Sequence, residues 1–303
     1  MTDEVRPPTP ASADVSELNN GPGSVPLILR SAGPAERNLK EHVRRQAIID
    51  RTLSWLVPAM GLAVWELAVN IGGINPQFFP PPSTIAGSAW ELLGTGTLLE
   101  HLVISVRRVI LGFVAGVVSG VLVGFLMGLS RRLRAAFEPT LMALYTVPKL
   151  ALLPLLLLIF GLGEAPKIIL IGMTVFFFMW IATLSAVLAV PKIHRDAAVS
   201  FGASRRQLAF HVQIPSTMPA IFVGLRISAG VSVLVMVGAE FVHGNDGIGY
   251  FIWHSWGLFL APRMYVGIIV VALMGLTFQL LVRAIGKWTM PWDESPKGVG
   301  GIQ

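Results

Sequence analysis

The stretch DAAVSFGASRRQLAFHVQIP, residues 196–215, is a polar segment between two strongly apolar ones. It begins shortly after the apolar residues 167–190 and ends just before the apolar residues 217–240. Its basic side chains cannot lie in lipid, because each would cost about 2.5–3.5 kcal/mol at the bilayer centre on insertion scales. The stretch therefore predicts a folded polar element outside the bilayer that joins two membrane spans.

Local signals in and just before this stretch predict two short helices joined by a tight turn. Pro191 suits a helix N-terminus, and Gly202 can take the left-handed conformation that ends the first helix. Ser204 and Gln207 have the spacing of a capping box, which predicts a second short helix that Pro215 ends. The element could be a plain connection, a DNA-recognition motif or a docking knob for a protein partner. Tethering between two spans argues against docking in a DNA groove, so no nucleic-acid partner is expected.

The composition of the whole chain is that of a polytopic membrane protein. Of the 303 residues, 53% are hydrophobic and only 13% are charged, whereas soluble domains carry about 25% charged residues. The absence of cysteine from the sequence excludes a disulfide framework and thiolate chemistry. The six histidines are scattered, and we see no catalytic set and no metal-ligand spacing among them. The expected fold class is all-α, in a lipid bilayer, with no catalytic residue, metal or cofactor.

Six apolar segments predict about six transmembrane helices, each near the ~20 residues that cross about 30 Å of hydrocarbon. Their expected bounds are 54–73, 105–129, 138–160, 167–190, 217–240 and 264–286. Pro139, Pro148 and Pro154 break the third segment. Between the first two spans, three consecutive prolines precede an amphipathic helix that Ser83 can cap. A further short helix at the membrane interface is expected within 249–262.

Two features inside the spans predict contacts. Glu66 in the first span is unusual in lipid and should face protein or water. In the second span glycine recurs every four residues, at Gly112, Gly116, Gly120, Gly124 and Gly128. This spacing places a glycine stripe on one helix face, where another backbone can approach closely. Tight packing within one chain is favoured over a seam between two copies.

The distribution of Lys and Arg orients the chain. The loops at 74–104, 161–166 and 241–262 contain basic residues only at their borders, whereas the alternate loops and both flanks are rich in them. Basic loops stay in the cytoplasm. We therefore expect six spans in the cytoplasmic membrane, with both termini and residues 191–215 on the cytoplasmic side.

Residues 196–215 resemble the cytoplasmic loop of permease subunits of ATP-binding-cassette importers. That loop carries the pattern E-A-A, three residues, G, nine residues, I-x-L-P. Here the chain has Asp196-Ala197-Ala198, then Gly202, then Val212-Gln213-Ile214-Pro215, with the same spacing throughout. Asp for Glu and Val for Ile are conservative departures. The stretches FPPPSTI (79–85), VPKLALLPLLLLIFGLGEAPKI (147–168), PAIFVGLRIS (219–228) and GNDGIGY (244–250) look like the nitrate, sulfonate and taurine branch of that family. The resemblance covers about residues 55–290.

The resemblance implies a function, a set of partners and a site. It implies the transmembrane permease of an ATP-driven importer for a small solute such as nitrate, a sulfonate or a related organic anion. The implied partners are a second copy of the permease, two ATPase subunits and an extracytoplasmic substrate-binding protein. The chain has no Walker A motif, which agrees with ATP hydrolysis in a separate subunit. The residues implied to couple to the ATPase are Asp196, Ala197, Ala198, Gly202, Ala203, Ser204 and Arg205.

The sequence also offers candidates for the transport pathway or its gate. Phe177 and Trp180 lie in an aromatic cluster of the fourth span, for which lipid contact or core packing is the plainer interpretation. Met236 and Glu240 lie near the end of the fifth span, where Glu240 should face the outside and gate the pathway, bind a counter-charge or contact the binding protein. The alternative function is a secondary transporter driven by an ion gradient. That function predicts paired intramembrane carboxylates and an inverted repeat, and we see neither clearly.

The expected division of the chain follows from these interpretations. It consists of a disordered tail 1–33, a cytoplasmic amphipathic segment 34–53, a transmembrane permease domain 54–290 with its coupling loop 191–215, and a cytoplasmic tail 291–303.

Overall fold

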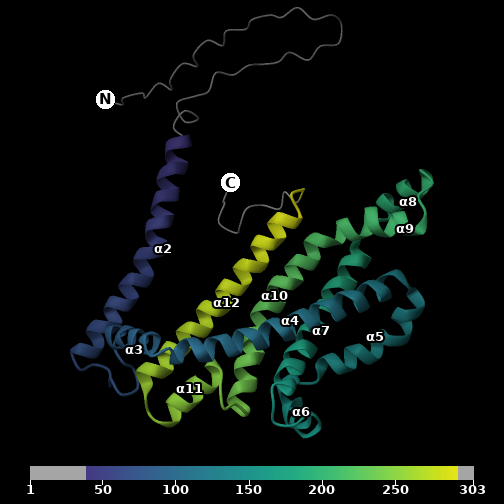
Figure 1. Cartoon of the computed structure of the whole chain (residues 1–303). Helices are drawn as coiled ribbons and strands as arrows, with labels where there is room; N and C mark the ends of the chain where they lie inside the picture. The colour runs from purple at the N-terminus through teal and green to yellow at the C-terminus, as the bar shows by residue number, and fades with distance from the viewer. Residues whose placement is uncertain (1–38, 293–303) are drawn as a thin grey trace, which may run out of the picture. The chain divides into compact units, whose positions relative to one another are not determined.

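The computed structural model describes residues 39–292, and every regular element in this range is a helix (Figure 1). The tail predicted at 1–33 and all but the first two residues of the one predicted at 291–303 lie outside the described range. The chain divides after Trp65 into two compact units. Most of helix α2 (Leu39–Asn70) belongs to the first unit, and the other described helices belong to the second.

Within the described residues 39–292, five helical segments are long and apolar enough to cross a membrane. They are Ile48–Asn70 of α2, α4 (Thr97–Leu129), α7 (Ala165–Ala189), Leu208–Val242, which contains α10 (Ile214–Val242), and α12 (Ala261–Thr289). A bent helix pair, Arg131–Thr146 with Lys149–Phe160, makes a sixth if it is counted as one span. The prediction of an all-α chain with about six spans is confirmed.

Helix α2 is continuous where the sequence predicted a surface segment followed by a separate span. It runs through the expected boundary at 53–54 without a break, because neither glycine nor proline interrupts the residues around that boundary. It ends at Asn70, three residues before the predicted end. Gly72 then takes the left-handed conformation, with φ +79°, which turns the chain out of the helix.

Helix α3 (Pro82–Gly94) is the predicted amphipathic helix, but the prediction that Ser83 caps it is wrong. Ser83 lies inside the first turn, and the preceding Pro81 provides no side-chain cap. The Glu66 carboxylate does so instead, since it accepts hydrogen bonds from the Ser83 N–H at 3.0 Å and from the Ser83 Oγ at 2.7 Å. An acidic group at a helix N-terminus satisfies free N–H groups and meets the positive end of the helix dipole. Glu66 therefore faces protein, as expected.

Helices α4 and α7 approach so closely that only glycine fits along part of their contact. A β-carbon added at Gly112 would lie 2.7 Å from Ile171 Cβ, and one added at Gly116 would lie 2.5 Å from the carbonyl oxygen of Gly172. A β-carbon added at any of the other three stripe glycines would likewise collide with a side chain of α7. The pairs are Gly120 with Met179, Gly124 with Thr183, and Gly128 with Val187. The glycine stripe thus packs within one chain, as the sequence favoured. Helix α4 is also longer than predicted and begins at Thr97.

The third apolar segment is bent by about a right angle rather than straight. Helix α5 (Arg131–Thr146) continues through Pro139, and the chain then bends by 88° before η1 (Lys149–Leu152) and α6 (Leu153–Phe160). Pro148 lies at the bend and restricts the residue before it, so Val147 is extended with φ −66° and ψ 126°.

The segment between α7 and α10 differs from its prediction at its C-terminal end. Helix α8 (Lys192–Ser200) is followed by α9 (Arg205–Gln207), η2 (Leu208–Gln213) and α10 without a break, so Pro215 does not end a helix. In η2 the hydrogen bonds take the wider π register, in which the N–H of Ile214 donates to the carbonyl of Ala209. The wide turn accommodates Pro215 in the first turn of α10, where its missing N–H is tolerated.

The last elements complete the second unit. Helix α11 (Ile248–Gly257) is the predicted interfacial helix, though it ends five residues earlier than expected, and α12 runs from Ala261 to Thr289. In Figure 1, α8 and α9 lie at one end of α10, and α11 lies at the other. This separation places the two candidate sites described next at opposite ends of α10.

Candidate functional site

At the start of α10 the chain forms an exposed turn, residues 191–207, that we call the knuckle. Gly202 has φ +80°, and its N–H donates to the Val199 carbonyl at 2.9 Å. The N–H of Ala203 donates to the Ala198 carbonyl at 3.0 Å. These two bonds satisfy carbonyls at the end of α8 in the pattern typical of a glycine-terminated helix. The predicted helix end at Gly202 is confirmed.

The second half of the knuckle begins with the predicted capping box. The Ser204 N–H donates to Gln207 Oε1 at 2.9 Å, and the Gln207 N–H lies 3.4 Å from Ser204 Oγ. Each side chain thereby satisfies a backbone group of the other at the start of α9. The turn from residue 201 to residue 204 is thus fixed by local hydrogen bonds on both sides.

The residues predicted to couple to an ATPase all lie on the knuckle. Asp196, Ala197 and Ala198 belong to α8, Gly202, Ala203 and Ser204 form the turn, and Arg205 opens α9. A β-carbon on Gly202 would meet no atom within 4 Å. Phe201, beside it, is 92% exposed, and Ile193 on α8 is 71% exposed. Apolar side chains so exposed on a polar element are typical of a surface that a partner covers.

A second site lies at the other end of α10, around Arg108 of α4. This guanidinium is fully buried, and we call it and its partners the Arg108 cluster. Its Nε donates to Glu164 Oε2 at 2.8 Å, and its Nη2 donates to Glu164 Oε1 at 2.5 Å. Its Nη1 donates to Glu240 Oε1 at 2.6 Å and to the Asp246 carbonyl at 3.1 Å, while Nη2 also bonds the Asp246 carboxylate. All five donors of the guanidinium are therefore used.

Glu240 is the innermost carboxylate of the cluster and is 1% exposed. Besides Arg108 it accepts from Ser105 Oγ, at 2.9 and 3.0 Å, and from the Gly249 N–H at 2.7 Å. Ser105 Oγ in turn accepts the N–H of Ile248 at 2.8 Å. The α4 arginine holds the carboxylate inside the protein, so Glu240 contacts a counter-charge, one of the three roles that the sequence left open. Its position toward the outer side of the membrane stays a prediction.

Glycines in the loop before α11 allow this burial. Gly247 has φ +94°, and a β-carbon there would collide with the Glu240 carboxylate. A β-carbon on Gly249 would lie 2.7 Å from Glu240 Cβ. The stretch GNDGIGY therefore wraps a buried carboxylate, which explains Gly247 and Gly249 better than a turn requirement alone.

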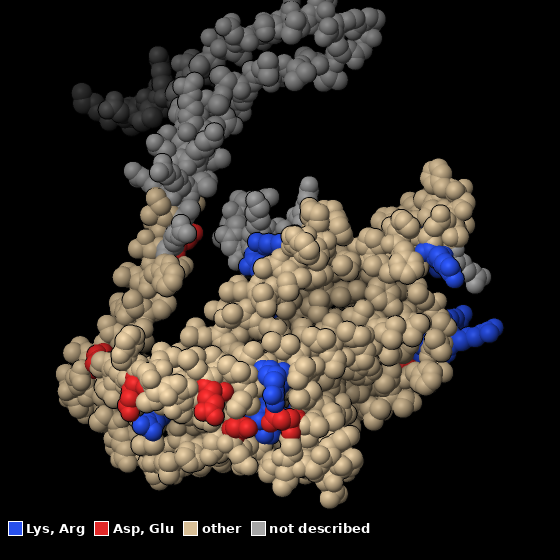
Figure 2. Space-filling view, viewed as in Figure 1, with Lys and Arg blue, Asp and Glu red and all other residues tan. Residues whose placement is uncertain are grey.

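The outer members of the cluster are partly exposed, and their charges are stabilised by Arg108. The hydrogen bond from Arg108, with the charges of Arg108 and Lys167, holds the pKa of Glu164 below its usual value. Burial alone would raise the pKa of Asp246, but its hydrogen bond to Arg108 and the same two positive charges lower it. Figure 2 shows red acidic side chains beside blue basic ones at the lower edge of the view, the end at which α3 and α11 lie in Figure 1.

Sequence reasoning identified only Glu240 in this cluster. Arg108 counted only as a basic residue at the border of a loop, and Glu164 lay within a loop without being singled out. The contacts of Arg108 with Glu164 and Glu240 join residues that are 56 and 132 positions apart in the sequence. A signal was available in the second span, where an arginine lies one turn inside an apolar helix and needs a partner. The glycines around Asp246 were the other signal.

The other pathway candidates are buried in this chain. Trp180 is fully buried and its Nε1 donates to Met127 Sδ at 3.1 Å. Phe177 packs edge-on against it, with ring centroids 6.3 Å apart. Met236 is fully buried in a different part of the core, among Met179, Ala229 and Val233. A lining role for these three remains a prediction.

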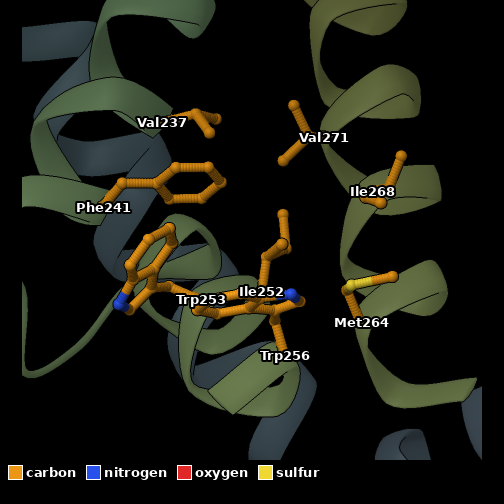
Figure 3. Close-up of a pocket in the computed structure, with 8 residues that line it drawn as sticks. All are labelled: Val237, Phe241, Ile252, Trp253, Trp256, Met264, Ile268 and Val271. Carbon is orange, nitrogen blue, oxygen red and sulfur yellow. The ribbon is translucent and has the colours of Figure 1, made fainter. Parts of the chain in front are cut away.

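An open apolar pocket of about 390 Å³ lies between α10, α11 and α12 (Figure 3). Phe241 and Val237 come from α10, the two tryptophans from α11, and Met264 faces them from α12. The ring centroids of Trp253 and Trp256 are 4.8 Å apart. The pocket has no charged lining residue, and within residues 39–292 no group of His, Asp and Glu side chains is arranged to hold a metal ion.

Comparison with known proteins agrees with this architecture. Residues 116–290 match the model of a family described as binding-protein-dependent transport system inner membrane component. The chain is 36% identical over 247 residues to the taurine transport system permease protein TauC of Escherichia coli (strain K12), covering 80% of this chain and 90% of that protein. It is 33% identical over 246 residues to the riboflavin transport system permease protein RibX of Chloroflexus aurantiacus, covering 78% and 92%.

The fold also resembles a solved transporter. An inward-facing structure of the MetNI methionine ABC transporter aligns with a TM-score of 0.53 and 18% identity, over 63% of this chain and 97% of that chain. Fold, family match and relatives together define an integral membrane permease of a transport system. The chain belongs to the family of binding-protein-dependent transport system inner membrane components. The resemblance seen in residues 196–215 is thereby confirmed.

Proposed function

We propose that two copies of this chain form the pathway of an importer, with two separate ATPase subunits in the cytoplasm and a binding protein outside. The observation that carries the proposal is the knuckle, a rigid and exposed turn that belongs to the membrane-spanning chain but lies outside its apolar helices. The partner subunits hydrolyse ATP, and this chain converts their motion into opening and closing of the pathway.

The knuckle is the contact with the ATPase. Its turn is held by two sets of local hydrogen bonds, so it can transmit a displacement without unfolding. Asp196, Ala197, Ala198, Gly202, Ala203, Ser204 and Arg205 form or flank the contact surface. The small side chains at the tip admit close approach, and the exposed Phe201 ring supplies an apolar anchor of the kind found in interface cores.

The two ends of α10 lie on opposite sides of the membrane. The helix has 29 residues, which corresponds to about 43 Å at 1.5 Å per residue, and this is more than the hydrocarbon thickness of about 30 Å. The knuckle, with its adjacent basic residues, is cytoplasmic, as are both termini. The Arg108 cluster then lies at the outer end, where the binding protein delivers the solute.

The solute is a small compound with an anionic group, and taurine, a zwitterion that carries a sulfonate, is the first candidate. This choice rests on the relative named for taurine transport and on the sequence stretches that resemble the nitrate, sulfonate and taurine branch. The relative named for riboflavin transport supplies the competing candidate, an uncharged heteroaromatic solute.

Reconstitution in proteoliposomes tests the function. The chain is purified with its ATPase and supplied with its binding protein, and uptake of radiolabelled taurine is measured with and without internal ATP. We expect uptake that requires ATP and the binding protein, together with binding-protein-stimulated ATP hydrolysis. Uptake that follows an ion gradient and ignores ATP would instead establish the secondary-transporter alternative.

Crosslinking tests the stoichiometry. Because the chain contains no cysteine, a single introduced cysteine labels one site per copy without background. Crosslinking in native membranes should give a pair of identical chains. A product containing a different permease would contradict the homodimer.

A further inference from the structure

Lys149 places a positive charge at the break in the third apolar segment. Its Nζ donates to the carbonyls of Leu144, Tyr145 and Val147, at 2.9, 2.7 and 2.7 Å. It also lies over two aromatic rings, 4.5 Å from the centroid of Phe177 and 5.5 Å from that of Tyr145. The ammonium group is therefore fixed in place by carbonyl and ring contacts.

The position of Phe177 gives the depth of this charge in the membrane. Phe177 is the middle residue of the 25-residue helix α7 (Ala165–Ala189), which is long enough to cross the hydrocarbon. Since Lys149 Nζ lies directly over the Phe177 ring, it lies near the middle of the bilayer. Ionisable groups at that depth are costly and are typical of solute and ion pathways.

No carboxylate neutralises this lysine among the described residues. The ion pairs there join Arg108, Lys167, Arg107, Arg134 and Arg263 to acidic groups, and none includes Lys149. The contrast with Arg108 is direct, because that buried cation contacts three carboxylates. In the described part of the chain, only carbonyl dipoles and ring faces thus compensate the charge of the Lys149 ammonium.

The lysine is also only half-buried in this chain. Its neighbours Tyr145 and Leu150 are exposed, so this face of the break is uncovered by the chain itself. A half-exposed ammonium cannot face lipid at this depth without a large free-energy cost. The face must therefore border a water-filled or protein-lined space in the assembled transporter.

We propose that Lys149 binds the anionic group of the transported solute at mid-membrane, beside Tyr145 and Phe177. This inference rests on the proposed import function and narrows its solute class to anions such as sulfonates. Three carbonyls use the hydrogen-bond donors of the ammonium but carry no net charge, so a sulfonate is attracted by the uncompensated positive charge and can replace one carbonyl as the acceptor. An uncharged heteroaromatic solute would gain no binding energy from the charge of Lys149.

Transport by variants of the complete complex tests the proposal. Gln at position 149 keeps two N–H donors but has no charge, whereas Arg keeps the charge. For Lys149→Gln we expect taurine uptake to fall about tenfold or more, the factor that corresponds to about 1.4 kcal/mol, with normal membrane level and ATPase association. Lys149→Arg should recover most of the uptake. Lys287→Gln, which removes an exposed lysine from the last turn of α12, is the matched control and should transport normally.

A second measurement leaves Lys149 unchanged and so does not depend on the folding of a variant at that position. A single cysteine is introduced as Tyr145→Cys, and its reaction rates with an anionic and a cationic methanethiosulfonate reagent are compared. We expect the anionic reagent, which is itself a sulfonate, to be favoured over the cationic one by about tenfold. The control is Leu158→Cys in α6, an 83% exposed position that should show no such preference.

The outcomes separate this inference from the proposed function. If the wild-type complex imports riboflavin but no anion, or if Lys149→Gln imports taurine at the wild-type rate, the anion site is wrong and the importer assignment stands. An anion-to-cation ratio at Tyr145→Cys equal to that of Leu158→Cys also overturns it. If no solute is imported in an ATP-dependent manner but the cysteine ratio is high, the site stands and the proposed function fails.

Discussion

At the residue scale, Arg108 shows how a membrane protein keeps a charge in its interior. Removing a guanidinium and a carboxylate from water is expensive, and their mutual attraction offsets this only when every donor and acceptor is satisfied. Arg108 meets this condition with five hydrogen bonds, and Glu240 meets it with help from Ser105 and the Gly249 N–H. The cluster joins α4, α10 and the loops before α7 and α11, so its loss should separate their outer ends.

Replacement of Arg108 by Gln should strongly destabilise the protein. It leaves Glu240 buried without its cationic partner, and breaking a buried ion pair in this way typically costs about 3–5 kcal/mol. The measurement is the melting temperature of the purified protein in detergent. Arg107→Gln is the matched control, because the Arg107 side chain is 60% exposed and, among residues 39–292, forms one ion pair, with Glu164 at 3.4 Å, so its removal should be nearly neutral. Equal melting temperatures for the two variants would rule out a structural role for the cluster.

The outer carboxylates predict how stability depends on pH. The pKa values of Glu164 and Asp246 are lowered from 4.5 and 3.8 in the folded protein. A lowered pKa contributes stability that is fully present above the ordinary value and is lost as the pH falls through the folded value. The melting temperature should therefore be insensitive to these groups at neutral pH and should fall below pH 4.5. In Arg108→Gln this acid-dependent loss should shrink, and an unchanged acid profile would contradict the assignment.

At the element scale, local signals in the sequence predicted much of the fold, and long-range pairing could not be predicted. Apolar length predicted the spans, and the positions of Gly202 and Ser204 predicted the knuckle. The four-residue glycine spacing predicted that α4 packs closely within the chain, but not that its partner is α7. Pro215 was misread because a π turn, which depends on how two helices join, accommodates it. The Arg108 cluster was missed because no local pattern specifies which distant carboxylate a lone arginine will meet.

The α4–α7 contact predicts a steric effect at Gly116. Replacing it by Val would force a β-carbon to within 2.5 Å of the Gly172 carbonyl oxygen and 2.7 Å of Val175 Cβ. Overpacking of this kind typically costs about 1–3 kcal/mol, so the melting temperature of Gly116→Val should fall. Gly87→Ala in α3 is the control, since a β-carbon there meets no atom within 4 Å and alanine favours the helix by about 1 kcal/mol. Thermal stability equal to wild type in Gly116→Val would show that the helices can separate without cost.

At the scale of the whole molecule, α10 connects the two candidate sites directly. The knuckle leads through η2 into its first turn without a break, and Glu240 lies two residues before its end. Because α10 also packs along α7 and α4, a displacement of the knuckle can move these helices together as one body. The Arg108 cluster then keeps the outer ends of the moving helices in register.

Gly202→Leu tests this arrangement, because it should spare the fold and damage the contact with the ATPase. Gly202 has φ +80° and open space around it, so the substitution costs about 1 kcal/mol of backbone strain. Bulk at a packed contact costs about 1–3 kcal/mol more. The two costs together are about 2 kcal/mol or more, which corresponds to about a thirtyfold loss of ATPase association or more. Gly96→Leu is the matched control, since Gly96, just before α4 and away from the knuckle, is left-handed with φ +77° and has equally open surroundings. Both variants should insert, but only Gly202→Leu should lose co-purification of the ATPase and uptake of solute, and equal co-purification would mean that the knuckle is not the contact.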